Sequence, residues 1–236
     1  AIRNDSFASY SAYTQTVTTV FMALFGVNFN VYFFLLMKKY AMAWRNTEVR
    51  AYFAIIAGST LIITLNILGM FPTAFDAFHH AFFAVSSVIT TTGFSTTDFD
   101  LWPQLSRCIL VLLMIVGACA GSTGGGVKVT TFAVIILTIR SVAQGRDDCV
   151  IADHHIESKT VYRALTIIVL GAVAVIGSAI VVYYNTSDAV SVVDAIFESC
   201  SAFGTVGLSV GVTSQLNNGA KILYMPVSYT HLRAHE

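Results

Sequence analysis

Long apolar runs alternate with short polar connections along the chain. A membrane-spanning helix needs about 20 predominantly apolar residues. Five runs matter on this scale, the third interrupted and the last only begun: residues 17–37, 51–71, 103–140, 161–184 and 220–225. This pattern predicts an all-α integral membrane protein.

Two shorter segments lie between the long runs, at residues 72–89 and 189–203. Both are too short and too polar to span a bilayer; their polar residues include Asp76, His79, His80, Ser86 and Ser87, then Asp194, Glu198, Ser199 and Ser201. Because lipid cannot pair with backbone N–H and C=O groups, we expect both to be re-entrant half-helices shielded by protein. Pro72 is expected in the first turn of the first half-helix, where its missing N–H costs nothing.

A glycine-containing stretch follows each half-helix, and the two stretches match. They read TTTGFS at residues 90–95 and GTVGLS at residues 204–209. With Gly93 aligned to Gly207, four further pairs coincide: Phe83 with Phe197, Ser87 with Ser201, Thr91 with Thr205, and Ser95 with Ser209. A dehydrated cation needs rings of backbone carbonyls, and glycine lets the backbone turn them inward. We therefore predict two filter segments whose carbonyls bind the ion, on Thr91, Thr92, Gly93, Thr205, Val206 and Gly207.

The predicted elements form a repeated unit of outer helix, re-entrant pore helix, filter and inner helix. A pseudo-fourfold cation pore needs four such units around one axis, and the chain holds fewer. We expect an inner helix of a preceding unit with its cytoplasmic link at 1–50, a complete third unit at 51–140, a cytoplasmic loop at 141–160 and a truncated fourth unit at 161–225. Residues 226–236 are polar, have no membrane period and are predicted to be a non-native tail. The chain is thus expected to be a fragment.

Residues 117–126 interrupt the third apolar run with five glycines among ten residues. Each glycine inside a helix costs about 1 kcal/mol relative to alanine, so we expect irregular backbone here. Such backbone survives at membrane depth only when it is buried in protein or lines a wet cavity. We therefore predict a gating loop below the filter, made of Gly117, Gly121, Ser122, Thr123, Gly124, Gly125, Gly126 and Lys128. The alternative is that the glycines only allow close helix packing.

Lys128 ends this loop, and two roles are open to it. It could place a positive charge near the passage or bind a neighbouring carboxylate. A phosphate-binding loop of the G-x-x-x-x-G-K-[ST] type is rejected, because the lysine is displaced, Val129 replaces the hydroxyl residue and no strand precedes the loop. His154 and His155 in the polar stretch 147–157 lack metal-ligand spacing, so no metal is predicted beyond the ion at the filter.

The charged residues indicate the orientation of the chain. Basic residues flank two of the connections: Lys38, Lys39, Arg45 and Arg50 at one, and Arg140, Arg146, Lys159 and Arg163 at the other. The opposite connections are acidic, with Asp76, Asp98, Asp100, Asp188, Asp194 and Glu198. The positive-inside rule makes the basic loops cytoplasmic, so that both filters open outward. The acidic outer face would concentrate cations, unless these are ordinary solvated loop charges.

Composition excludes several classes of function. The chain is 56% hydrophobic and only 11% charged, against roughly 25% charge in soluble domains. Its formal net charge of +0 leaves no basic surface for nucleic acid. The spans lack the paired carboxylates or Ser/His/Asp set that a membrane enzyme would need, so we expect no enzyme.

The motif at residues 91–96, the repeat and the run from Gly117 to Lys128 resemble the Trk/Ktr/HKT superfamily of potassium transporters, most closely its bacterial Trk-type membrane subunits. The resemblance covers nearly all of residues 10–225. It implies gated potassium uptake by a multi-pass protein of the bacterial inner membrane, with K⁺ as the transported ion and no organic cofactor. It also implies a homodimer of the full-length protein and a cytosolic nucleotide-binding regulatory subunit. Sodium or sodium–potassium cotransport by the same fold is the alternative, because the first two filters are absent.

Overall fold

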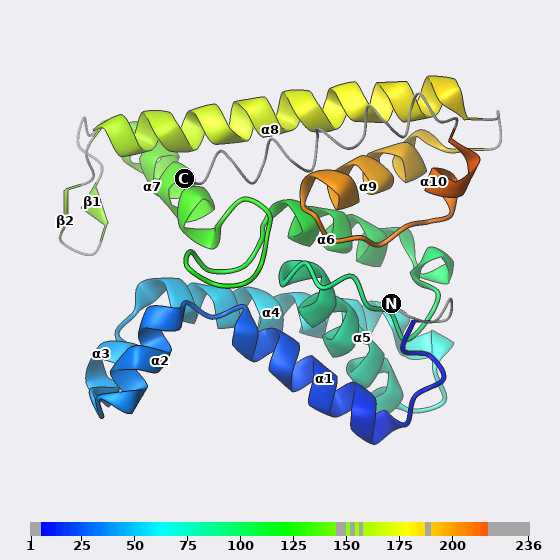
Figure 1. Ribbon diagram of the computed structural model, residues 1–236, viewed down its shortest axis with the longest axis horizontal. Coiled ribbons are helices and arrows are strands. Elements are labelled where there is room, and N and C mark those ends of the chain that lie inside the picture. The colour runs from blue at the N-terminus through cyan, green and yellow to red at the C-terminus, as the bar shows by residue number, and fades with distance from the viewer. Residues whose placement is uncertain (1–5, 145–149, 152–153, 156–157, 187–189, 217–236) are drawn as a thin grey trace.

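The computed structural model describes residues 6–144, 150–151, 154–155, 158–186 and 190–216 of the chain. Almost all regular structure in these residues is helical (Figure 1). The helices are α1 (Ala12–Phe25), α2 (Phe29–Leu36), α3 (Tyr40–Trp44), α4 (Thr47–Ile67), α5 (Ala74–Ile89), α6 (Gln104–Ile115), α7 (Val129–Ala143), α8 (Ser158–Asn185), α9 (Val192–Phe203) and α10 (Val212–Gln215). Short 3-10 turns, η1 (Leu68–Met70) and η2 (Phe99–Leu101), and an antiparallel pair of two-residue strands, β1 (Val150–Ile151) and β2 (His154–His155), complete the described elements.

Two helices of the described residues are long and apolar enough to cross a membrane. The first is α4 together with η1, which runs over 24 residues, and the second is α8, with 28 residues. In Figure 1, α8 lies along one side of the molecule, packed against α7 and α9. Its outer face exposes large apolar side chains, among them Leu165, Val169, Leu170, Val173, Ile176 and Ile180. An apolar surface of this extent suits hydrocarbon rather than water.

The first apolar run, predicted at residues 17–37, does not form one continuous helix. It forms α1 and α2 instead, bent by 93° at a short break. Asn28 begins α2 by accepting from the N–H of Asn30 at 2.9 Å. The backbone groups freed by the break pair with a distant segment, because Gly26 O accepts from Cys119 N and Phe29 N donates to Gly121 O, both at 3.1 Å. The bend therefore depends on a contact that the local pattern does not contain.

The two shorter segments form the helices α5 and α9, close to their predicted limits. Thr73 caps α5 by accepting from Asp76 N at 3.1 Å. Pro72 therefore lies before the cap, and its predicted place in the first turn is wrong. Ser191 and Asp194 form a capping box at the start of α9. Both helices are covered by protein, α5 by α1, α4 and α6, and α9 by α6, α8 and α10. Their backbones are thus shielded from lipid.

The third apolar run is broken, as its glycines predict. Helix α6 ends at Ile115 and α7 begins at Val129, close to the expected limits. The intervening loop at residues 116–128 lies in the middle of the molecule, between α6, α7 and the end of α5 (Figure 1). Its two ends lie side by side, with Gly117 N donating to Val127 O at 2.8 Å.

Candidate functional site

The chain leaves α5 through a tight turn. Thr91 N donates to Val88 O at 3.0 Å, and Thr92 N donates to Ser87 O at 2.9 Å. The fully buried Oγ of Ser87 also donates to the carbonyl of Phe94 and accepts from its N–H, both at 2.7 Å. One hydroxyl therefore fixes the far end of the turn to the helix that begins it.

The chain leaves α9 through the same turn. Thr205 N donates to Ala202 O at 3.2 Å, and Val206 N donates to Ser201 O at 2.9 Å. The buried Oγ of Ser201 donates to the carbonyl of Leu208 at 2.6 Å. Each of these residues aligns with its counterpart in the first turn when Gly207 is matched to Gly93. The repeat seen in the sequence is thus also a repeat of backbone geometry.

Both turns contain left-handed residues at matching positions. Thr91 has φ 55° and Gly93 has φ 74°, while Thr205 has φ 57° and Gly207 has φ 80°. Positive φ is a genuine outlier for a β-branched residue such as threonine, and persists only where the surroundings enforce it. The residue between each pair does not share the positive φ. The sign of φ thus alternates in the same order over both turns, at residues 91–93 and 205–207.

The two turns meet at Gly93. A Cβ atom there would lie 2.0 Å from the carbonyl oxygen of Val206, so a side chain at this position would force the backbone of the second turn to shift. Gly207 has no atom within 4 Å of its hypothetical Cβ, so only its positive φ requires glycine. The structure thus gives Gly93 a steric requirement that it does not give Gly207.

The glycine-rich loop lies against both turns. Gly125 N donates to Thr91 Oγ1 at 2.7 Å, and a Cβ on Gly125 would lie 2.2 Å from Thr205 Oγ1. A Cβ on Gly117 would lie 2.0 Å from the carbonyl oxygen of Gly125. The loop reaches the turns so closely because these positions carry no side chain.

The other side of the loop reaches the break between α1 and α2. Thr123 Oγ1 donates to Phe25 O at 3.1 Å, and Gly121, with φ 65°, faces Asn28. Ser122 Oγ bonds within the loop to Cys119 O at 2.6 Å. Of the predicted gating residues, Gly124 and Gly125 therefore approach the turns, and residues 121–123 face away from them.

Two charged side chains hold the loop. The carboxylate of Glu48, at the start of α4, accepts from Ala120 N at 2.5 Å and from Asn28 Nδ2 at 3.3 Å. Lys128 Nζ donates to the carbonyl of Gly124, so its observed partner is a backbone oxygen and not a carboxylate. Sequence reasoning missed Glu48, because an acidic residue in a first helical turn is already explained by the helix dipole.

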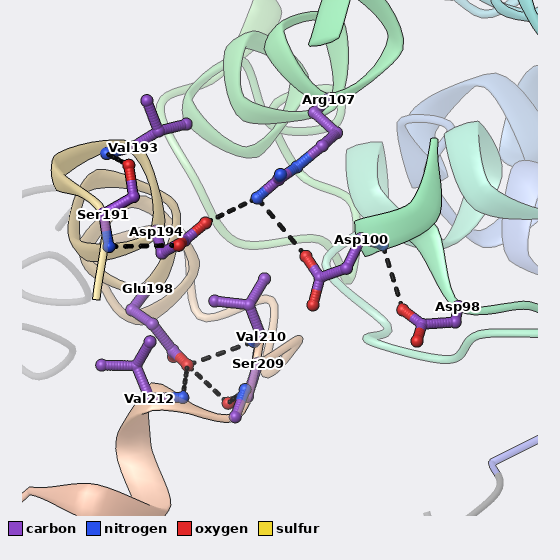
Figure 2. A network of polar contacts seen from close by, with 11 residues as sticks. Asp98, Asp100, Arg107, Ser191, Val193, Asp194, Glu198, Ser209, Val210 and Val212 are labelled. Carbon is purple, nitrogen blue, oxygen red and sulfur yellow. Dashed lines mark hydrogen bonds and ion pairs between the residues drawn. The ribbon is translucent and has the colours of Figure 1, made fainter. Parts of the chain in front are cut away.

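An ion-pair network joins the segment after the first turn to α9 (Figure 2). Arg107 of α6 lies 2.6 Å from Asp194 and 3.4 Å from Asp100. Burial raises the pKa of Asp100, while Arg107 acts in the opposite direction and the acidic neighbours add to the rise. Two of the acidic residues assigned to the outer face are therefore paired with a cation, whereas Asp98 is exposed. Arg107 was missed because it lies within an apolar run.

Glu198 is not the outer-face charge that its sequence position indicated. Its side chain is 3% exposed and points from α9 toward the segment that follows the second turn (Figure 2). A cavity of about 350 Å³ is lined by this residue and by parts of the turn, including Thr205 and Gly207. The described residues hold no group of three or more His, Cys, Asp or Glu that could bind a metal.

Comparisons with known proteins indicate a cation transporter. A family model described as TrkH, cation transport protein, matches residues 1–226. An uncharacterized cation transporter of Mycoplasma pneumoniae, the MG322 homolog, is 35% identical over 62% of this chain and 26% of its own length. Ktr system potassium uptake protein B of Vibrio alginolyticus is 35% identical over 62% of this chain and 32% of its own length. The Trk system potassium uptake protein TrkH of Escherichia coli is 32% identical over 49% of this chain and 24% of its own length. The chain thus spans about a quarter to a third of these relatives.

A solved structure shares the fold. The crystal structure of the potassium transporter TrkH from Vibrio parahaemolyticus matches with a TM-score of 0.82 and 23% sequence identity. The match covers 99% of this chain and 52% of that one. The whole described arrangement of helices and turns therefore has a counterpart in about half of a larger membrane protein.

Proposed function

The chain belongs to the TrkH family of cation transport proteins, which are multi-pass membrane transporters and not enzymes, and we propose that its two matched turns are filter segments of a potassium pore. The observation that carries this proposal is the identical alternation of left-handed residues after α5 and α9, at two turns that meet at Gly93. Potassium is the ion named for the Ktr and Trk relatives.

The filter would act by replacing water around the ion. The proposed donors are the backbone carbonyls of Thr91, Thr92 and Gly93, with those of Thr205, Val206 and Gly207. From Thr91 and from Thr205 onward each segment has a single glycine, whereas the matching stretch of tetrameric potassium channels has two, so we expect a shorter filter and weaker selectivity. The buried hydroxyls of Ser87 and Ser201 would keep the donors in place without touching the ion.

The elements suit the proposed pore units. Helix α4 would be an outer helix, α5 its pore helix, and α6 with α7 the broken inner helix. Helices α8 and α9 would begin the next unit, while α1 and α2 would close the preceding one. We propose that the remaining units lie in the part of the relatives that this chain does not match. The term full-length transporter is used below for a protein as long as these relatives, with this chain as its C-terminal half.

The loop at residues 116–128 is the proposed gate. Its contacts with Thr91 and Thr205 put it directly against both filter segments, where it would obstruct an ion leaving them. Its other face and its tether at Glu48 lie beside α2 and the start of α4, on the side that the basic loops assign to the cytoplasm. A cytosolic partner could thus bias the loop. The names of the relatives describe them as parts of Trk and Ktr systems, which supports the proposal that a regulatory subunit binds the full-length transporter. We also propose that the full-length transporter forms a homodimer.

Cation flux in a bacterial host that lacks potassium uptake tests the function. We expect the full-length transporter to restore growth at low potassium and to carry potassium in proteoliposomes. Sodium-dependent potassium flux would favour cotransport, and sodium flux that exceeds potassium flux would favour the sodium alternative. A folded, membrane-inserted protein that moves no cation would refute the proposal.

A further inference from the structure

Glu198 is a buried carboxylate that binds five groups of one short segment. Its Oε1 accepts from Ser209 Oγ at 2.5 Å, from Val210 N and Val212 N at 3.2 Å each, and from Thr213 N at 3.3 Å. Its Oε2 accepts from Thr213 Oγ1 at 2.8 Å. Figure 2 shows the side chain reaching from α9 to this segment, which leads directly out of the second filter turn.

The charge of this carboxylate has no cationic partner in the described part of the chain, where the ion pairs all involve Arg107. A buried charge is costly unless hydrogen bonds satisfy it. Here the partners are three backbone N–H groups and two hydroxyls, all of which can donate to a carboxylate. The hydrogen bonds are thus the compensation for burial, and they link the position of Glu198 to that of residues 209–213.

The first turn has a different arrangement at the equivalent place. Ala84 occupies the position that aligns with Glu198, and it has no polar side chain. The segment after the first turn is held by Ser6 Oγ, which accepts from Ser95 N at 3.0 Å, and by His80 Nδ1, which lies 2.9 Å from Thr96 Oγ1. The two turns match in backbone geometry, whereas the second alone depends on a buried charge.

The anchor lies close to the strained part of the turn. Glu198 and Ser209 line the same cavity of about 350 Å³ as Thr205 and Gly207, whose φ angles are positive. Strained backbone persists only where the surroundings over-determine it. Ser201 binds the end of the turn at Leu208. Glu198 binds the residues that follow directly in the chain, beginning with Ser209.

We propose that Glu198 is a positioning residue that fixes the second filter segment and thereby determines how well the pore discriminates potassium from smaller cations. This inference rests on the proposed function. The carboxylate acts by holding Ser209 to Thr213, and without it Thr205 to Gly207 would relax toward ordinary φ values. A relaxed filter can contract around a smaller ion, so selectivity falls before conduction does.

The test compares ion selectivity in the full-length transporter and its variants. Glu198→Gln keeps the size of the side chain but its Nε2 atom cannot accept from Thr213 Oγ1, and Glu198→Ala removes all five bonds. We expect the permeability ratio of potassium to sodium to fall by roughly threefold to tenfold in Glu198→Ala, the factor that corresponds to one ordinary hydrogen bond. Glu198→Gln should show a smaller fall.

Asp98→Asn is the matched control. Asp98 is an exposed carboxylate of the segment after the first turn, and asparagine retains its bond from Asp100 N, which measures 3.0 Å. We expect unchanged selectivity. If Glu198→Gln and Asp98→Asn lower flux alike and leave the permeability ratio unchanged, Glu198 acts only as a surface charge, and the inference is wrong.

Two further variants decide the matter if the Glu198 variants do not assemble. Ser209→Ala and Thr213→Val each remove one donor and leave the carboxylate in place. Both should lower the permeability ratio in the same direction, and unchanged ratios in both would overturn the inference. Absence of cation flux in the unmodified full-length transporter would instead refute the proposed function itself.

Discussion

Four left-handed residues define the two turns, and the structure distinguishes them by their surroundings. At Gly93 a side chain would meet both an unfavourable φ and the carbonyl of Val206, whereas at Gly207 it would meet only the unfavourable φ. A left-handed conformation costs about 1–2 kcal/mol for an ordinary residue. The two glycines are therefore not equivalent, although the sequence repeat presents them as such.

This difference predicts unequal effects of the same substitution. In the full-length transporter, Gly93→Ser and Gly207→Ser should both reduce the discrimination of potassium over sodium. The loss should be larger for Gly93→Ser, because the added Cβ must displace the backbone of the second turn. Reversal potentials under mixed potassium and sodium gradients measure both effects. Equal losses would show that the contact between the turns does not exist in the full-length transporter.

The ion pairs of Arg107 with Asp100 and Asp194 should make the effect of removing Arg107 on stability depend on pH. Because burial raises the pKa of Asp100, the folded protein binds a proton there more readily than the unfolded chain, so this group's contribution to stability falls as pH rises. In Arg107→Gln the carboxylates of Asp100 and Asp194 would face each other unneutralised. We expect this variant to lose melting temperature at neutral pH and to recover part of it as the pH is lowered, because a carboxyl whose pKa is raised binds a proton before an ordinary carboxyl does. Melting curves of purified protein measure this.

The control is Asp98→Asn. Because the carboxylate that it removes is exposed, the melting temperature should be nearly unchanged at neutral and at lowered pH. An Arg107→Gln variant with the same loss at both would show that Arg107 contributes packing and not charge neutralisation.

Residues that act across the fold were the least predictable. Glycines, threonines and serines of the two turns could be identified because they recur in register along the chain. Glu48, Arg107 and Glu198 could not, because each acts through a partner segment that only the tertiary structure brings near. Glu198 in particular was predicted to belong to an acidic outer face that concentrates cations, whereas its contacts are with five donors that follow it in the chain.

At the scale of elements, the apolar pattern predicted most helix limits to within a few residues. It failed at the α1–α2 break. Residues 17–37 are apolar enough for one span, and the bend exists because Cys119 and Gly121 of the loop take up the backbone groups that it frees. Hydropathy reports burial in lipid or protein, and it carries no information about such a pairing.

Changes in the loop at residues 116–128 should have the clearest effect on cation flux. Deletion of residues 118–125 in the full-length transporter should raise flux and weaken its dependence on a regulatory partner. Gly125→Ala should act in the same direction but less strongly, because its Cβ would lie 2.2 Å from Thr205 Oγ1 and push the loop away from the turn. Isotope flux into proteoliposomes, with and without the partner, measures both.

Gly58→Ala on α4 is the matched control, since no atom lies within 4 Å of the added Cβ. It should leave flux unchanged. A loop deletion that folds normally and preserves both flux and regulation would show that the loop only packs between helices, and the gate would lie elsewhere.

At the scale of the whole molecule, the chain supplies two proposed filter segments, and a fourfold pore needs four. Converging strands must surround a dehydrated cation, and exposed filter carbonyls in lipid would each cost several kcal/mol. We therefore expect the 236-residue chain by itself to insert into membranes without conducting. Planar bilayer recordings test this. Potassium currents from the chain alone would mean that several copies assemble into a closed pore.

The left-handed threonines have a consequence for the protein without its ion. Thr91 and Thr205 each hold strain of about 1–3 kcal/mol. In the proposed filter a bound ion would hold the carbonyls of both turns in place, and its concentration would raise the melting temperature by mass action. We expect the full-length transporter to melt at a higher temperature in potassium chloride than in choline chloride of equal ionic strength, with sodium chloride in between. The order of the three salts would then report the affinity of the empty filter for each ion without any measurement of transport.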